Sequence, residues 1–170
     1  MQNKHPKNTA KQSKRYAFVA VHRGGSLTKE NHRKLMKWAR VCAEHVLPLI
    51  DKEIDQRLLY ALEIAKEWEK DLVPTGVAIK ASLGAHAVAR QSEDPIYKAV
   101  ARSIGQAVAT AHMADHSLGG AFYAIKAVKL ANKNIERERD WQNKKLDELP
   151  DELREIIQAM WKMKELDRRL

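Results

Sequence analysis

Residues 103–112 read SIGQAVATAH, and this alanine-rich run sets the class of fold. It lies in the middle of residues 76–131, where 15 of 56 residues are alanine. Alanine has the highest helix propensity, and no part of the chain after Gly25 alternates apolar and polar residues as a half-buried strand does. The sequence therefore predicts an all-α fold, a single compact domain of about six or seven helices.

The same segment repeats a short phrase of serine, an aliphatic residue and glycine. It occurs as Ser82-Leu83-Gly84, Ser103-Ile104-Gly105 and Ser117-Leu118-Gly119. The unequal spacings of 21 and 14 residues disfavour a solenoid, whose repeats keep one period. Glycine inside a helix costs about 0.5–1 kcal/mol relative to alanine, so a compensating gain is expected at each phrase. Close packing of helix backbones in an Ala/Gly-rich centre is the favoured explanation, and a ligand pressed against the backbone is the alternative.

Helix boundaries follow on both sides of this centre. Asp94-Pro95 places a capping carboxylate before a proline suited to a first helical turn, which predicts a helix over residues 95–115. Earlier helices are predicted over residues 28–46, from Asp51 or Asp55 onward, and over residues 76–91. Later ones are predicted over residues 120–132 and as two peripheral helices that meet near Pro150. The pair Gly119-Gly120 either separates two helices or lies inside one, and the sequence leaves both open.

Positive charge is concentrated at the start of the chain. The net charge is +9, and residues 1–34 hold nine Lys and Arg against one acid, Glu30. We therefore divide the chain into a basic, partly disordered N-terminal arm, residues 1–27, and a nearly neutral helical domain, residues 28–170. Within the arm, residues 16–21 form a short apolar run that could be a strand, a docked extended segment or a short helix. Residues 1–15 are either a solvated tail or a weak nucleic-acid contact, with Tyr16 and Phe18 available for stacking on bases.

The single cysteine and the absence of a long apolar run favour the cytoplasm. Cys42 cannot form an intramolecular disulfide, and Lys, Arg or His interrupts every apolar stretch before the roughly 20 residues that a membrane span needs. Cys42, Glu44 and His45 fall within one helical turn, the arrangement that activates a cysteine nucleophile. Cys42 also lies on an apolar helical stripe, where a free thiol behaves as a small hydrophobic group, so we favour core packing.

Four residues are candidates for metal or small-ligand binding. His112, Asp115 and His116 have the spacing of one helical face, and His86 could add a third imidazole. Helical zinc proteases need a Glu directly after the first His, and Met113 occupies that position. Structural histidines are therefore favoured over a metal site. The sequence contains no glycine-rich phosphate loop, G-x-S-x-G elbow or C-x-x-C pair, so we assign no catalytic residue and no cofactor.

Residues 30–160 resemble the immunity proteins of bacterial polymorphic toxin systems, a small helical family. The resemblance rests on residues 32–39, HRKLMKWA, on residues 42–49, CAEHVLPL, on residues 85–90, AHAVAR, and on residues 105–112, GQAVATAH, with His116 and Gly119. It implies a cytoplasmic, non-enzymatic protein that binds and neutralises a cognate toxin. The family has no catalytic residues to carry over to this chain.

The resemblance does not place the toxin-binding surface. If the toxin were a nuclease with a basic site, acids would face it, and the candidates are Glu63, Glu67, Glu69, Asp71 and the pair Glu93-Asp94. A solvated helix face is the plainer explanation of these acids. A homodimer through residues 141–161, which include Trp141 and Trp161, is a further possibility. We rank an immunity protein first, a nucleic-acid-associated helical protein second and a metal or small-ligand protein third.

Overall fold

Residues 17–170, the part of the chain that the computed structural model describes, form eight α-helices and two single-turn 3-10 helices. The α-helices are α2 (Lys29–His45), α3 (Gln56–Glu69), α4 (Thr75–Gln91), α5 (Pro95–Ala109), α6 (His116–Leu130), α7 (Ile135–Leu146), α8 (Asp151–Met163) and α9 (Leu166–Arg169). The 3-10 helices are η1 (Val21–Arg23) and η2 (Leu47–Leu49). No β-strand is present in this range, so the all-α prediction is confirmed.

Side-chain caps fix several of the predicted helix starts. Asp94 Oδ1 accepts hydrogen bonds from the backbone N–H of Ile96 and Tyr97 at 2.9 and 3.1 Å, which explains why α5 begins at Pro95. Thr28 and Asp55 cap α2 and α3 in the same way. The predicted end at residue 115 was wrong, because the chain leaves α5 after Ala109 and makes consecutive turns before α6.

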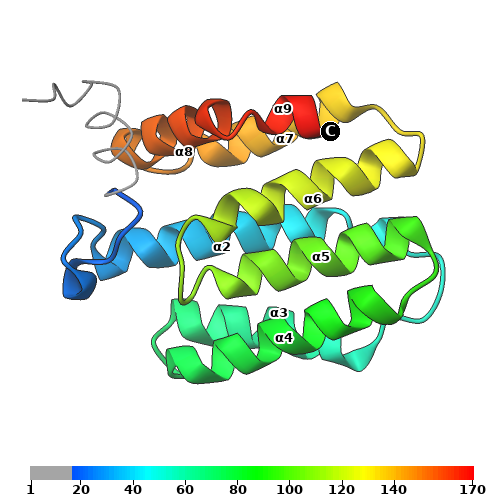
Figure 1. Cartoon of the computed structure of the whole chain (residues 1–170), viewed down its shortest axis with the longest axis horizontal. Coiled ribbons are helices and arrows are strands. Elements are labelled where there is room, and N and C mark those ends of the chain that lie inside the picture. Colours follow the sequence, from blue (N-terminus) through cyan, green and yellow to red (C-terminus); the bar gives the residue numbers. More distant parts are fainter. Residues whose placement is uncertain (1–16) are drawn as a thin grey trace, which may run out of the picture.

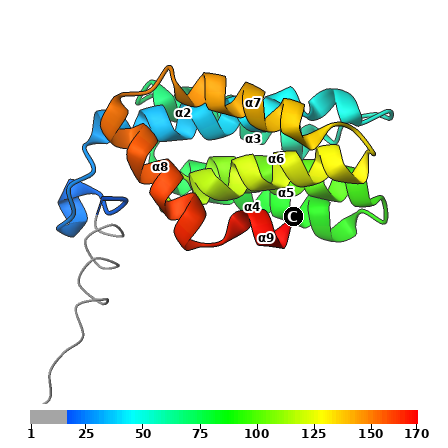
Figure 2. The same ribbon diagram turned by 90° about the horizontal axis from the view of Figure 1, so that it is seen from above.

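The central helices form one layer of antiparallel neighbours. In Figure 1, α4, α5 and α6 lie side by side, with α2 and α3 behind them. Helix α5 contacts α2, α3, α4 and α6, and ten of its fifteen residues are buried. In Figure 2, α7 runs along the α2 side of the bundle, while α8 crosses one end. The small residues of α5 explain its central place, since alanine and glycine let four helix backbones approach it.

Glycines mark two of the closest approaches. A Cβ on Gly105 of α5 would lie 2.7 Å from Cε1 of His86 on α4, and a Cβ on Gly119 of α6 would lie 2.5 Å from Oε1 of Gln106. Close helix packing at these two repeated phrases is therefore confirmed, although a side chain of the neighbouring helix, not its backbone, fills the space beside each glycine. At Gly84, by contrast, the nearest atom is 3.9 Å away, which is an ordinary contact, so that phrase does not need glycine. Gly119 and Gly120 lie inside α6, so they do not separate two helices, and the break between α5 and α6 lies at residues 110–115 instead.

The segment before α2 is docked on the bundle. Phe18 and Leu27 belong to the core, and Ala20 and Leu27 form an isolated parallel bridge. The chain reverses through η1 and Gly24, whose φ of 84° is the left-handed conformation that glycine adopts easily. None of the three alternatives describes this apolar run as a whole, because residues 17–19 form a turn and a bend, Ala20 makes the isolated bridge and Val21 begins η1. The predicted nucleic-acid contact of residues 1–15 lies outside the described residues.

No helix within residues 17–170 is both long and apolar enough to cross a lipid bilayer.

Candidate functional site

The four predicted ligand residues do not form one cluster. His112 lies in the turn between α5 and α6, and His116 is the first residue of α6, so the prediction of one shared helical face was wrong. The two rings remain 5.1 Å apart between centroids. Asp115 instead faces the C-terminal end of α8, where its Oδ2 accepts from Nζ of the capping residue Lys164 at 3.2 Å. His86 contacts a different part of α5.

Two of these histidines join α4, α5 and α6 through polar contacts. Arg102 Nη1 of α5 donates to Nδ1 of His86 at 3.0 Å, and Nδ1 of His116 lies 2.7 Å from Gln106 Oε1. Burial and the nearby Arg102 charge lower the pKa of His86 from 6.5 to about 4. Burial also lowers the pKa of His116. Both imidazoles are therefore neutral near pH 7 and bind their neighbours as hydrogen-bonding groups.

The metal alternative has no support in the described part of the chain. No group of three His, Cys, Asp or Glu side chains within residues 17–170 is arranged to hold a metal ion. The contacts of His86, His116 and Asp115 explain why, since each is directed to a different partner residue.

Cys42 and His45 are not paired as nucleophile and base. The Cys42 side chain is fully buried in α2, and burial together with the Glu138 charge raises the pKa of its thiol well above 9.0. His45 points to α7, where Nδ1 donates to Glu138 Oε2 at 2.8 Å and the ring stacks on Trp141 at 3.6 Å. The core-packing interpretation of Cys42 therefore agrees with the geometry. Burial also raises the pKa of Glu138, whose Oε1 accepts from Gln142.

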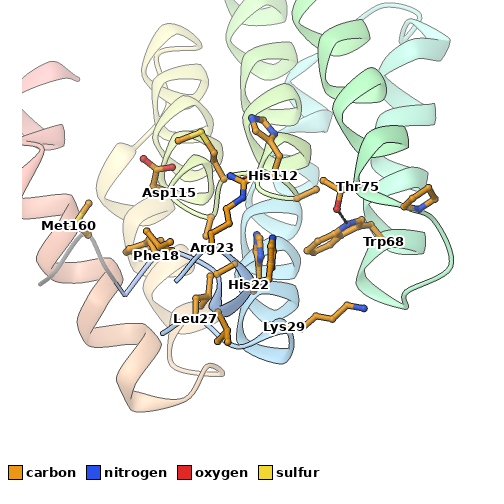
Figure 3. A pocket seen from close by; sticks show the side chains of 18 of the residues that line it. Phe18, His22, Arg23, Leu27, Lys29, Trp68, Thr75, His112, Asp115 and Met160 are labelled. Atoms are coloured by element: carbon orange, nitrogen blue, oxygen red, sulfur yellow. Dashed lines mark hydrogen bonds between the residues drawn. The ribbon is translucent and has the colours of Figure 1, made fainter. Parts of the chain in front are cut away.

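A cavity of about 1230 Å³ opens at one end of the bundle. Figure 3 shows that the segment before α2 closes one side of it, with the α5–α6 turn and α8 around it. Its walls are apolar at Phe18, Trp68 and Met160, and Arg23 Nη1 donates to the carbonyl of His112 at 3.3 Å across its edge. Sequence reasoning missed this cavity because it forms only when residues 17–27 fold back on helices distant in the chain.

The acids expected to face a basic toxin are largely engaged within the molecule. Glu69 receives two hydrogen bonds from Arg40, Nε to Oε1 at 2.6 Å and Nη2 to Oε2 at 3.0 Å. Asp71 pairs with Lys29 and Arg33 at 2.7 and 2.8 Å. Glu63 pairs with Lys66, and Asp94 pairs with Lys52. Glu67 and Glu93 form no ion pair within residues 17–170, so four of the six predicted acids are engaged and two are not.

Unpaired positive charge gathers instead on the central layer. Helices α4, α5 and α6 contain six Lys and Arg and no Asp or Glu. None of these six cations forms an ion pair with an acidic side chain within the described residues. Lys129 donates to the main-chain oxygen of Leu170, and the other five are Lys80, Arg90, Lys98, Arg102 and Lys126. The nearly neutral average over residues 28–170 conceals this segregation. Charge counted helix by helix would have shown it.

The comparison with protein families agrees with this helical architecture. The Imm-5 like putative immunity protein family matches residues 25–149. The chain belongs to this family. The match runs from the segment before α2 through α7, and it leaves α8, α9 and most of the N-terminal arm of this Imm-5 like protein outside. No curated protein and no solved structure matches the chain.

The two tryptophans of the predicted homodimer contact have partners within the chain. Trp141 stacks on His45, and Trp161 Nε1 donates to Asp167 Oδ1 at 3.0 Å. Homodimerisation stays a prediction.

Proposed function

We propose that this Imm-5 like protein binds a cognate protein toxin and blocks its action without catalysing a reaction itself. Family membership over residues 25–149 is the observation that carries the proposal. The expected partner is the toxin domain encoded by a neighbouring gene.

The arrangement of reactive groups supports a binding role. The Cys42 thiol is buried with a raised pKa, and Nδ1 of His86 and Nδ1 of His116 are engaged with Arg102 and Gln106. A cysteine nucleophile needs an accessible thiolate, and the buried Cys42 thiol does not offer one. A rigid helical body suits inhibition by binding, because little ordering is needed when the partner docks.

Co-expression tests the proposal. The neighbouring toxin domain is expressed in a laboratory host alone, with this protein, and as a catalytically inactive variant that shows how much growth loss is due to toxicity. We expect this protein to restore growth and to co-purify with the inactive toxin domain as a stable complex. Growth loss that this protein does not relieve, with no complex on size-exclusion chromatography, would overturn the proposal.

A further inference from the structure

We propose that the solvent-facing side of α4, α5 and α6 is the surface that docks the toxin, and that the toxin presents an acidic surface to it. This inference rests on the proposed function. We call this surface the basic face and define it by four residues, Arg90, Lys98, Arg102 and Lys126.

Three helices contribute to one continuous surface. Beyond its first turn, α5 exposes only the line Lys98, Arg102 and Gln106. Before its last turn, α6 exposes only residues 116, 119, 123 and 126. Contacts join these lines: Arg102 reaches His86 of α4, and Gln106 lies against His116 and Gly119 of α6. Figure 1 looks onto this layer, with the three helices side by side.

The charges of the basic face have no partners on their own helices. Arg90 and Lys98 are exposed, Arg102 and Lys126 are half-buried, and none of the four forms an ion pair within residues 17–170. On α2, by contrast, Lys34 pairs with Glu30 and Arg40 pairs with Glu44. Like charges without counter-charges repel one another in the free protein, and an acidic partner relieves that repulsion on binding.

The basic face is also preorganised. His86 of α4 packs directly on Gly105 of α5, and Gln106 of α5 packs directly on Gly119 of α6, each closer than a larger residue at the glycine would allow. These two contacts fix the spacing of the three helices. Arg102 is held by His86, and Lys126 lies 5.9 Å from the centre of the Tyr123 ring. A surface fixed in this way loses little conformational entropy when a partner docks.

The apolar content of this surface favours a protein over a nucleic acid. Leu83, 58% exposed, lies one turn before His86 on the same side of α4. Tyr123 is half-buried beside Lys126, so this surface presents no freely exposed aromatic ring for a base to stack on. An exposed leucine among cations matches a protein interface, in which apolar contacts are surrounded by charges. The toxin surface that docks on the basic face is therefore acidic, and it is not the basic substrate site of a nuclease.

Charge reversal tests the basic face. The face variant carries three substitutions, Arg90→Glu, Lys98→Glu and Lys126→Glu. Arg102 is kept because it holds His86. A matched control changes the net charge equally at three exposed, unpaired lysines of α2, α7 and α8, namely Lys37→Glu, Lys144→Glu and Lys162→Glu. A second face variant with glutamine at the same three positions removes the charges without adding acids, in case the reversed charges disturb folding.

Binding to the purified, inactive toxin domain is measured by surface plasmon resonance at several salt concentrations, after thermal unfolding has verified each fold. We expect the face variant to bind about 100-fold more weakly, chiefly through slower association, and the control to bind like wild type. The glutamine variant should lie between them, and wild-type affinity should fall as salt rises.

Each other outcome has a definite meaning. If wild type binds and the face variant keeps its affinity, the basic face is not the docking surface, although the proposed function stands. Equal losses in the face variant and the control would assign the effect to total charge, which also overturns the inference. If the face variant keeps its affinity for toxin and loses affinity for a single-stranded oligonucleotide, the surface binds nucleic acid instead. If wild type does not bind the toxin domain at all, the proposed function fails first.

Discussion

The contact between Gly105 and His86 gives a prediction that can be worked out from distances. A Cβ added at Gly105 would lie 2.7, 2.8 and 2.9 Å from three atoms of the His86 ring. Carbon atoms in contact prefer separations near 3.5 Å, so Gly105→Ala requires the ring to retreat by roughly 0.8 Å. The ring is held by Arg102 at 3.0 Å, so this displacement also weakens a hydrogen bond.

The expected loss in unfolding free energy follows from three contributions. Forcing the His86 side chain away from its rotamer costs about 0.5–1.5 kcal/mol, and loosening the Arg102 bond costs a similar amount. Replacing glycine by alanine within a helix raises the unfolding free energy by about 0.5–1 kcal/mol, which offsets part of this loss. The net effect is a loss of about 1 kcal/mol, which lowers the midpoint of thermal unfolding by about 2–4 °C for a chain of this size.

Gly84→Ala is the matched control, because its new Cβ would meet only Arg57 Cβ at 3.9 Å. It should raise the midpoint through helix propensity alone. His86→Ala provides a second background, in which the obstructing ring is absent and Gly105→Ala should stabilise the protein. A double-mutant cycle measured by urea unfolding should therefore give an interaction energy of about 2 kcal/mol. If Gly105→Ala raised the midpoint in wild type as much as Gly84→Ala does, the reasoning about this contact would be refuted.

Three further predictions concern the ion pairs, the histidines and the thiol. Glu69→Ala leaves the buried Arg40 guanidinium without its two-bonded partner and should lower the unfolding free energy by about 2–4 kcal/mol in denaturant titrations, whereas Glu63→Ala, at an exposed pair, should change it by less than about 0.5 kcal/mol. Stability should decline as pH falls from 6.5 towards about 4, because the unfolded chain protonates histidines that the fold keeps neutral, with Glu138 opposing the trend; a flat profile of midpoint against pH would contradict this. The histidines with a lowered pKa are His32, His86, His112 and His116. Cys42 should resist a thiol reagent in the native protein and react after denaturation, and rapid native labelling would show that α2 opens.

Much of the fold could be predicted because its signals are local. Thr28, Asp55 and Asp94 cap helices at or beside the predicted starts, since a capping bond spans only two or three residues. The end of α5 was not predicted, because alanine-rich residues continue beyond Ala109 and nothing in their composition marks the turn. The close approaches at Gly105 and Gly119 were predicted as a class, although the sequence did not name their partners.

The candidate surface depends on contacts that the sequence does not state. His112, Asp115 and His116 have helical spacing, yet the turn after α5 redirects them, and Asp115 finds Lys164, which lies 49 residues away. Glu69 of α3 looks available in the sequence because its partner, Arg40, lies 29 residues earlier in the chain. Ion pairs of this kind decide which charges remain free, and they exist only in the folded protein.

The attachment of α7 has a consequence for how the molecule opens. Buried Glu138 and Gln142 tie α7 to His45 and to the carbonyl of Ala121, at 2.8 and 3.1 Å. Side-chain hydrogen bonds that attach one helix to its neighbours open more readily than the closely packed, buried helices around α5. The C-terminal helices should therefore exchange their amide hydrogens together, ahead of α5, as a separate cooperative unit. A partner held on α4, α5 and α6 would slow exchange in the slow unit and leave the fast one unchanged.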